Sequence, residues 1–503
     1  MMVEIAMRRL RYGFASVGWT QTKGPTLRRE ATHCIAYHPP RFWWSKRIAV
    51  GAVLFLILLA GLVVGTTRAT KSRYDSLVET YRAAGEPVYV EDFNKTVKIA
   101  EDENAATYYT KAEREYDPPA GITSSRQFNN LIQSCLDSGT NAFASEIQSF
   151  IDSNGLTLEL LRQGGQCERV EWGYTYTRPL FNAFFPSFAP TRNLAKLAAI
   201  GAAHSHKSGH DREALSRVIS IQRLGDYRCI GAPLLVGHLV AMSILNLPCS
   251  VVEFIGHDLR VEPESGGGTA EEATRQQVHA LIDALLDESK LRLSRLHGFA
   301  GERALILDSV NEIRSGKGVA WYPAPPPPFS WLLRPVFTEQ ARQIAELMTE
   351  TVLAANSETF PEAMRLYPDI ETYISRGANK LLPAAILMPS YERTILLDFR
   401  LRAQRRMAAI SLAIRLFEID HGARPRTLEE LVPDYLDSVP CDPFAEGSVA
   451  IRYLPAADMP VLYSVGENGI DESGTFELRS DGSVNMDKAD LVFFLNGDRP
   501  QCR

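Results

Sequence analysis

The sequence predicts a mainly α protein with a single N-terminal transmembrane helix and a small α+β module at its C-terminal end. Three observations lead to this fold class. An apolar run of 18 residues, 48–65, contains no charge and no proline. Apolar residues recur at helical spacing through much of residues 70–400. Short β-rich runs separated by glycines follow between residues 449 and 495.

The apolar run predicts a membrane span over residues 48–67. Twenty residues give roughly 30 Å of helix at about 1.5 Å per residue, enough to cross a bilayer core. Trp43 and Trp44 precede the run, where interfacial aromatic residues are common. A cleaved signal peptide would have a shorter apolar region, and a buried core helix would not have such basic flanks. We therefore favour an uncleaved anchor over both alternatives.

The distribution of charge predicts the topology. Residues 1–47 contain nine Lys or Arg and two acids, which gives +7, whereas the other residues contain 45 bases and 58 acids, which gives −13. Cytoplasmic flanks are enriched in Lys and Arg. We expect a cytoplasmic basic head, 1–47, a single pass through the inner membrane and a periplasmic body. The net charge of −6 argues against nucleic acid as a partner, so the expected partners are the membrane and proteins of the cell envelope.

The body, residues 70–315, has the pattern of irregular helical hairpins. Residues 191–206 and 211–224 predict two helices joined by a short turn, and no fixed repeat period is present. The apolar stretch Val236–Ile255 contains His238, Asn246 and Pro248, so we interpret it as a core helix and not as a second span. Residues 316–335 are proline-rich and predict a linker or loop, with a docking motif for an aromatic groove as the alternative. Residues 336–390 continue the helical pattern.

Catalytic signatures are weak in this sequence. It contains no GxSxG, Walker A or GxGxxG motif, and its seven scattered cysteines form no CxxC pair. His206 and His210 have the i, i+4 spacing of metal ligands, but a turn separates them, so solvated histidines at a hairpin tip are the favoured interpretation. The sequence singles out no catalytic or cofactor-binding residue.

The C-terminal module, residues 391–498, has the most specific pattern. Met407, Ile410, Ile414 and Phe417 form an apolar stripe on a helix that we expect from about Arg393 to Ile419. The other face of this helix is expected to be basic; its arginines are Arg400, Arg402, Arg405 and Arg406. A capping box at Thr427 predicts a short helix. Four runs predict antiparallel strands covered by the long helix: Val449–Tyr453, Val461–Val465, Thr475–Arg479 and Leu491–Leu495.

This region resembles the globular part of the type II secretion major pseudopilins. The matching pieces are Asp420-His421-Gly422 with Pro425, Pro440-Cys441-Asp442-Pro443-Phe444, Tyr463-Ser464-Val465-Gly466 and Asp490-Leu491-Val492. The chain departs from that family because its membrane span lies over 320 residues upstream of the module. The resemblance therefore does not imply a pilus subunit. The whole layout resembles large single-anchor proteins of planctomycete-type bacteria that carry a pseudopilin-like tail.

The resemblance also implies a Ca²⁺ site, because a loop in this family binds calcium in several members. The best candidate ligands are the carboxylates of Asp471, Asp487 and Asp490, since Ca²⁺ prefers carboxylate and carbonyl oxygens. The alternative is an ordinary acidic hairpin. Together these patterns favour a membrane-anchored extracytoplasmic scaffold or interaction protein. An envelope hydrolase, with a site assembled from dispersed residues of the helical body, is the alternative.

Overall fold

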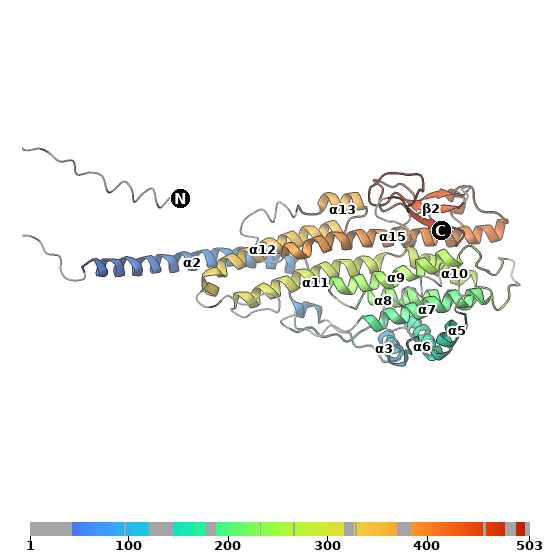
Figure 1. Cartoon of the computed structure of the whole chain (residues 1–503), viewed down its shortest axis with the longest axis horizontal. Coiled ribbons are helices and arrows are strands. Elements are labelled where there is room, and N and C mark those ends of the chain that lie inside the picture. The colour runs from blue at the N-terminus through green and yellow to red at the C-terminus, as the bar shows by residue number, and fades with distance from the viewer. Residues whose placement is uncertain are drawn as a thin grey trace, which may run out of the picture. The chain divides into compact units, whose positions relative to one another are not determined.

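The computed structural model describes residues 43–94, 97–119, 144–177, 188–231, 233–264, 267–315, 326, 329–369, 384–455, 459–477 and 489–497. The chain divides into two units, residues 1–61 and residues 62–503. Most of the described residues belong to the second unit, which is predominantly helical and contains a small antiparallel sheet near its C-terminal end (Figure 1).

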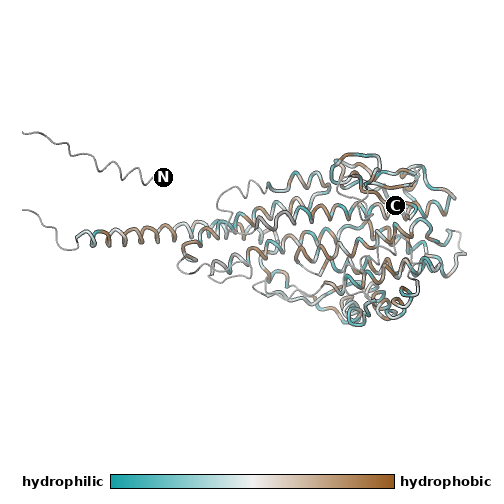
Figure 2. The backbone as a smooth tube through the Cα atoms, in the orientation of Figure 1, coloured by the Kyte–Doolittle hydropathy of each residue, from teal (hydrophilic) through white to brown (hydrophobic). Residues whose placement is uncertain are grey.

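Helix α2, Trp43–Ala83, contains the predicted span. Its apolar run is strongly exposed: Leu54 is 56% and Leu58 is 73% accessible, as expected of side chains that meet lipid. Figure 2 shows this run as a hydrophobic band in the first part of the helix. Beyond the run, Tyr74, Val78 and Tyr81 are buried in the second unit. The helix is therefore a candidate membrane span by length and composition.

One other helix, α9 (Leu235–Ile255), is also long and apolar enough to be a candidate span among the described residues. In its most apolar stretch of 18 residues, 67% is buried within the second unit, where α9 packs against α7, α8, α11 and α15. The prediction of a buried core helix is confirmed for this segment. His238, which interrupted the apolar pattern, has no exposed surface, and its side chain is used inside the helical body.

The body is built from helices that range from a single 3-10 turn, η1, to more than ten turns, α15. Before α9 they are η1 Val90–Phe93, α3 Ala105–Glu115, α5 Ala144–Ser153, α6 Gly155–Gln166, α7 Ala189–Lys207 and α8 Asp211–Arg228. After α9 they are α10 Arg275–Leu286, α11 Ser289–Arg314, α12 Phe329–Ala355, α13 Phe360–Leu366 and α15 Ala384–His421. Because α12 begins at Phe329, residues 329–335 of the expected linker are helical, while residues 316–325 lie outside the described part of the chain.

The hairpin of α7 and α8 confirms the predicted pair of helices. Gly209, at φ +86°, supplies the left-handed turn between them. The expectation of solvated histidines is wrong for His206, which is 7% exposed. Its Nδ1 lies 2.6 Å from Asp211 Oδ1, and its Nε2 lies 3.0 Å from Asp258 Oδ1. These carboxylates outweigh the effect of burial and raise the pKa of His206, so this histidine ties the hairpin to the end of α9.

The C-terminal sheet has three antiparallel strands in the order β1-β2-β3. They are β1 Arg452–Leu454, β2 Val461–Ser464 and β3 Leu491–Phe494. Residues 475–477 are not a strand, so the expected strand at Thr475–Arg479 is wrong over its described part. The short helix is a 3-10 turn, η5 Leu428–Leu431, and Thr427 makes no side-chain cap, which corrects the predicted capping box.

Helix α15 lies between the sheet and the rest of the body (Figure 1). The predicted stripe of Met407, Ile410, Ile414 and Phe417 is buried, at most 9% exposed. The expected basic face is not a surface, however, because Arg402 and Arg405 are at most 2% exposed. That side of α15 packs against α9 and α10. The long helix therefore shares one hydrophobic core with both the sheet and the helical body.

Candidate functional site

A serine, a histidine and an aspartate converge inside the body. His238 Nδ1 lies 3.1 Å from Ser294 Oγ, and His238 Nε2 lies 3.2 Å from Asp398 Oδ1. Burial alone would raise the pKa of Asp398, but Arg295 and His238 outweigh it and lower the pKa to about 2. All four side chains are at most 4% exposed. A substrate cannot reach this group without opening the core, so we interpret it as a structural polar network.

An aromatic pocket of about 540 Å³ lies where η1 meets the segment 170–176. Its lining includes Trp172, Tyr174 and His297 together with carboxylates of Asp92 and Glu171. Both carboxylates are already engaged by the backbone. Asp92 Oδ2 accepts from the amides of residues 88 and 89 at 2.9 Å, and Glu171 accepts from those of residues 97 and 173. These groups order loops, which leaves less scope for acid–base chemistry.

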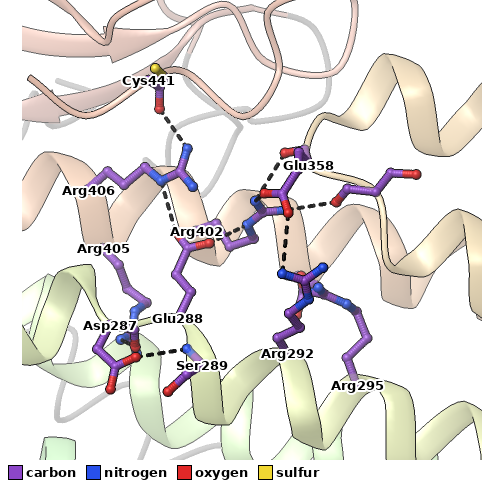
Figure 3. Close-up of polar contacts among 12 residues, drawn as sticks. Asp287, Glu288, Ser289, Arg292, Arg295, Glu358, Arg402, Arg405, Arg406 and Cys441 are labelled. Atoms are coloured by element: carbon purple, nitrogen blue, oxygen red, sulfur yellow. Dashed lines mark hydrogen bonds and ion pairs between the residues drawn. The ribbon is translucent and has the colours of Figure 1, made fainter. Parts of the chain in front are cut away.

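A cluster of arginines and carboxylates forms where the end of α10 and the start of α11 meet α15 (Figure 3). Arg405 ends α10: its Nε donates to Leu285 O at 3.0 Å, and its Nη2 donates to Ala284 O at 2.7 Å and Asp287 O at 2.9 Å. Carbonyls at a helix C-terminus have no partner within the helix and carry partial negative charge. The buried guanidinium of Arg405 supplies both the hydrogen-bond donors and the positive charge that these carbonyls require.

Glu288 is the centre of this cluster. Its Oε2 accepts from Arg402 Nε at 2.7 Å, and its Oε1 accepts from Arg406 Nε at 2.8 Å. Burial would raise the pKa of Glu288, but the two guanidinium groups outweigh it and lower the pKa. We call Glu288, Arg402, Arg405 and Arg406 the junction cluster. Glu288 is therefore ionised at neutral pH and holds α15 against the α10–α11 junction.

The junction cluster reaches the segments that follow α15 through Arg406. Its Nη1 donates to Cys441 O at 2.7 Å (Figure 3). The next residue, Asp442, is fully buried at 1% exposed, and its carboxylate accepts from Ser464 Oγ at 2.6 Å and from the amide of Val465 at 3.0 Å. Residues 440–444 and 463–466 are thus joined to each other by Asp442 and to α15 by Arg406.

A second pocket, of about 590 Å³, opens over this seam between the body and the C-terminal module. We call it the seam pocket. Its walls come from α10, from Glu358 and Thr359 just before α13, and from residues 433–448, and Arg406 and Glu288 form part of its lining. Asp283, Asp434 and Asp437 add negative charge to its rim. Its chemistry suits a polar or basic segment of a partner better than an apolar ligand.

Of the three predicted Ca²⁺ ligands, Asp487 lies outside the described residues. Asp471 is engaged by its neighbours, because its Oδ2 accepts from Arg452 Nε at 2.8 Å and its Oδ1 accepts from Tyr463 OH at 3.2 Å. Within the described ranges, no group of three or more His, Cys, Asp or Glu side chains is arranged to hold a metal ion. The three-aspartate site therefore stays a prediction.

Asp490 has a different neighbour from the one predicted. Its side chain is fully buried, its Oδ2 accepts from the amide of Gly474 at 2.7 Å, and Glu472 lies within hydrogen-bonding reach. Asp490 Oδ1 and Glu472 Oε2 are both buried and have no donor among the described residues. Burial and the facing carboxylate raise the pKa of Asp490 to about 6. Two such oxygens need a shared proton or a cation between them.

Sequence reasoning missed both the junction cluster and Glu472. A signal for the first was present: Arg402, Arg405 and Arg406 have the i, i+3, i+4 spacing of a single helix face, within a helix whose neighbouring positions are also apolar. A helix that is apolar nearly all round is buried, so its arginines must find carboxylates or carbonyls. Glu472 had no such signal, because its approach to Asp490 depends on the path of the loop.

Comparison of the chain with protein-family models, with curated proteins and with solved structures gives no match in any of the three.

Proposed function

We propose that this protein is a membrane-anchored scaffold or interaction protein, held by a single pass in the inner membrane with its body on the periplasmic side. The span in α2 and the basic residues 1–47 support the anchor and its orientation. Reporter fusions after Arg73 and after Arg503 should both give a non-cytoplasmic signal. A cytoplasmic signal at either position would contradict this topology.

The observation that carries the interaction function is the seam pocket. It lies where the pseudopilin-like region joins the helical body, and it has more carboxylates than cations on its walls. The resemblance of residues 391–498 to a subunit of an assembly machine makes this region the expected recognition surface. We infer a protein partner in the cell envelope that presents a basic segment to this pocket.

Site-specific photocrosslinking tests this inference in native membranes. A photoreactive residue at Asp437, which is exposed on the pocket rim, should give a discrete adduct, and the same residue at Glu159 on α6 should not. Asp434→Lys should abolish the Asp437 adduct because it reverses the charge that the partner meets. Equal adducts at both positions, or an adduct that is insensitive to Asp434→Lys, would count against a partner in the seam pocket.

The alternative, an envelope hydrolase, has its best location in the aromatic pocket, which combines His297 with carboxylates on an open surface. A Ca²⁺ ion in the C-terminal loop is a separate proposal and is compatible with either function. It is supported by the facing oxygens of Asp490 and Glu472, which a cation would bridge.

A further inference from the structure

The start of α12 carries an apolar surface that the helical body does not cover. Phe329 is 57% exposed and Trp331 is 38% exposed, and both lie in the first turn of the helix. Leu333, one turn after Phe329, packs on the hydrophobic core and so fixes the direction of this end of the helix. Two positions apart on a helix, Phe329 and Trp331 point to different sides of it, so apolar surface is exposed around this end of α12. Exposed large apolar side chains are typical of a surface that meets another apolar phase.

The register between α12 and α2 shows where this surface lies. Tyr81 OH donates to Ala345 O at 3.0 Å, and Arg73 and Ser76 of α2 line one shallow pocket together with Arg342 of α12. Earlier residues of α2 contact earlier residues of α12, and later residues contact later ones. The two helices therefore run side by side and parallel. Both stretches belong to the second unit, residues 62–503.

The first turn of α12 lies at about the same height along α2 as the end of the membrane span. Phe329 is 16 residues before Ala345, and Gly65 is 16 residues before Tyr81, which corresponds to about 24 Å along a straight helix at about 1.5 Å per residue. Pro335 lies in this interval of α12 and an interior proline kinks a helix, so the count places Phe329 near the level of residues 63–65, the last part of the apolar run. Val63 is 5% exposed although Leu62 beside it is 63% exposed, which shows that the body reaches this level on one side of α2.

We propose that the first turn of α12 lies in the boundary between headgroups and acyl chains of the bilayer that α2 crosses. This inference rests on the proposed membrane anchor, and it adds a second contact that does not span the membrane. Trp is enriched at this depth because its ring is apolar and its N–H can still find a polar partner. Arg68 and Arg73 on α2 and Arg334 on α12 follow within about two turns, at the level of the lipid phosphates.

A contact between α12 and the membrane would restrict how the body rotates and tilts. One helix crossing a bilayer leaves the attached body free to rotate about the helix axis and to tilt. A second contact, made by a helix that is packed into the body core through Phe337 and Ala341, removes much of that freedom. The surfaces of the body would then face the membrane, or face away from it, in a defined way.

Quenching of tryptophan fluorescence by brominated lipid tests this proposal on the full-length chain. The protein is reconstituted in nanodiscs of phosphatidylcholine, either plain or brominated near the carbonyl end of the acyl chains. The emission of Trp331 is obtained as the difference between wild type and Trp331→Phe. We expect bromination to reduce this difference roughly by half or more, because the ring lies among the brominated carbons.

Two controls separate the outcomes. Trp172→Phe removes a tryptophan that is stacked inside the body, with Arg228 4.0 Å above its ring, and its emission should be unaffected by bromination. A Trp43→Phe, Trp44→Phe double variant reports on the flank of the span. Quenching of Trp43 and Trp44 without quenching of Trp331 would overturn the second contact and leave the anchor standing. Absence of quenching at Trp43, Trp44 and Trp331 would contradict the membrane anchor itself.

Discussion

Glu288, 20% exposed, and Asp490, fully buried, are two carboxylates that the fold treats in opposite ways. Glu288 lies between Arg402 and Arg406, and its pKa is lowered despite its burial. Asp490 faces Glu472, and its pKa is raised to about 6. One group is ionised and fully paired, whereas the other shares its site with a group of the same charge.

This comparison distinguishes a buried charge that holds segments together from a buried charge that could bind a proton or a cation. A buried ion that has partners on every side serves to hold segments together, and its removal exposes the partners that remain. A buried carboxylate opposite another carboxylate costs stability until a proton or a cation bridges the two. The junction cluster is therefore expected to respond to mutation, and the Asp490–Glu472 pair is expected to respond to solution conditions.

The largest expected effect is that of Glu288→Gln. This change removes the countercharge that Arg402 and Arg406 share and leaves Arg402 only the more distant Glu358, at 3.6 Å. Breaking a buried pair costs about 3 kcal/mol of unfolding free energy. Chemical denaturation of the full-length protein in detergent, followed by circular dichroism, measures the loss.

Glu159→Gln is the matched control for this variant. It breaks a pair with Arg162 that is also short, at 2.6 Å, but both side chains are more than 40% exposed. Exposed pairs contribute less than about 1 kcal/mol, so the control should be close to wild type. Equal losses from the two variants would show that the junction cluster is no more than a surface ion pair.

The sequence predicted what depends on periodicity and failed where packing between distant segments decides. Ile410 and Ile414 follow a helical stripe, and both are buried as expected. Arg405 was expected on a basic outer face, yet its Nε donates to Leu285 O at 3.0 Å, across 120 positions of sequence. The residues of one helix do not determine whether its second face is exposed to water or packs against further helices.

The candidate sites show the same limit. Asp490 was identified from an acidic motif, but its neighbour is Glu472, because the turn at Gly474, with φ +75°, brings that loop back over β3. The buried group of Ser294, His238 and Asp398 joins residues from three helices, so no spacing within a short stretch of sequence could have predicted it. Sequence patterns can supply the residue types of a site, whereas its membership depends on tertiary contacts.

The second prediction concerns Asp490. Asp490→Asn should stabilise the protein at pH 7.5 by on the order of 1 kcal/mol. The shift of its pKa from 3.8 to about 6 corresponds to more than this, but partial exposure of Glu472 screens the repulsion. Millimolar Ca²⁺ should raise the melting temperature of the wild type and leave Asp490→Asn unchanged, because a ligand of the folded state stabilises it by mass action. A Ca²⁺ response that persists in Asp490→Asn would exclude this pair as the site.

The third prediction contrasts the pH dependence of the two carboxylates. The folded pKa of Asp490 is raised, so its contribution to stability is complete below about pH 4 and is lost as the pH rises through about 6. The folded pKa of Glu288 is lowered, so its contribution is complete above its unfolded pKa of about 4.5 and is lost as the pH falls. Thermal unfolding between pH 3 and pH 8 should show Asp490→Asn flattening the decline toward pH 7, and Glu288→Gln flattening the acid limb. The same change of profile in both variants would refute the contrast.

The smallest expected effect is that of Asp471→Asn. Asp471 pairs with Arg452 at 2.8 Å, but its side chain is 45% exposed, so the loss of stability should be below about 1 kcal/mol. If Asp490 and Glu472 hold the cation, Asp471→Asn should keep the Ca²⁺-induced rise in melting temperature, because Arg452 and Tyr463 already occupy the carboxylate of Asp471. Loss of that rise in Asp471→Asn, with stability in chelator unchanged, would instead place Asp471 among the ligands. Arg452 would then have to release it when Ca²⁺ binds.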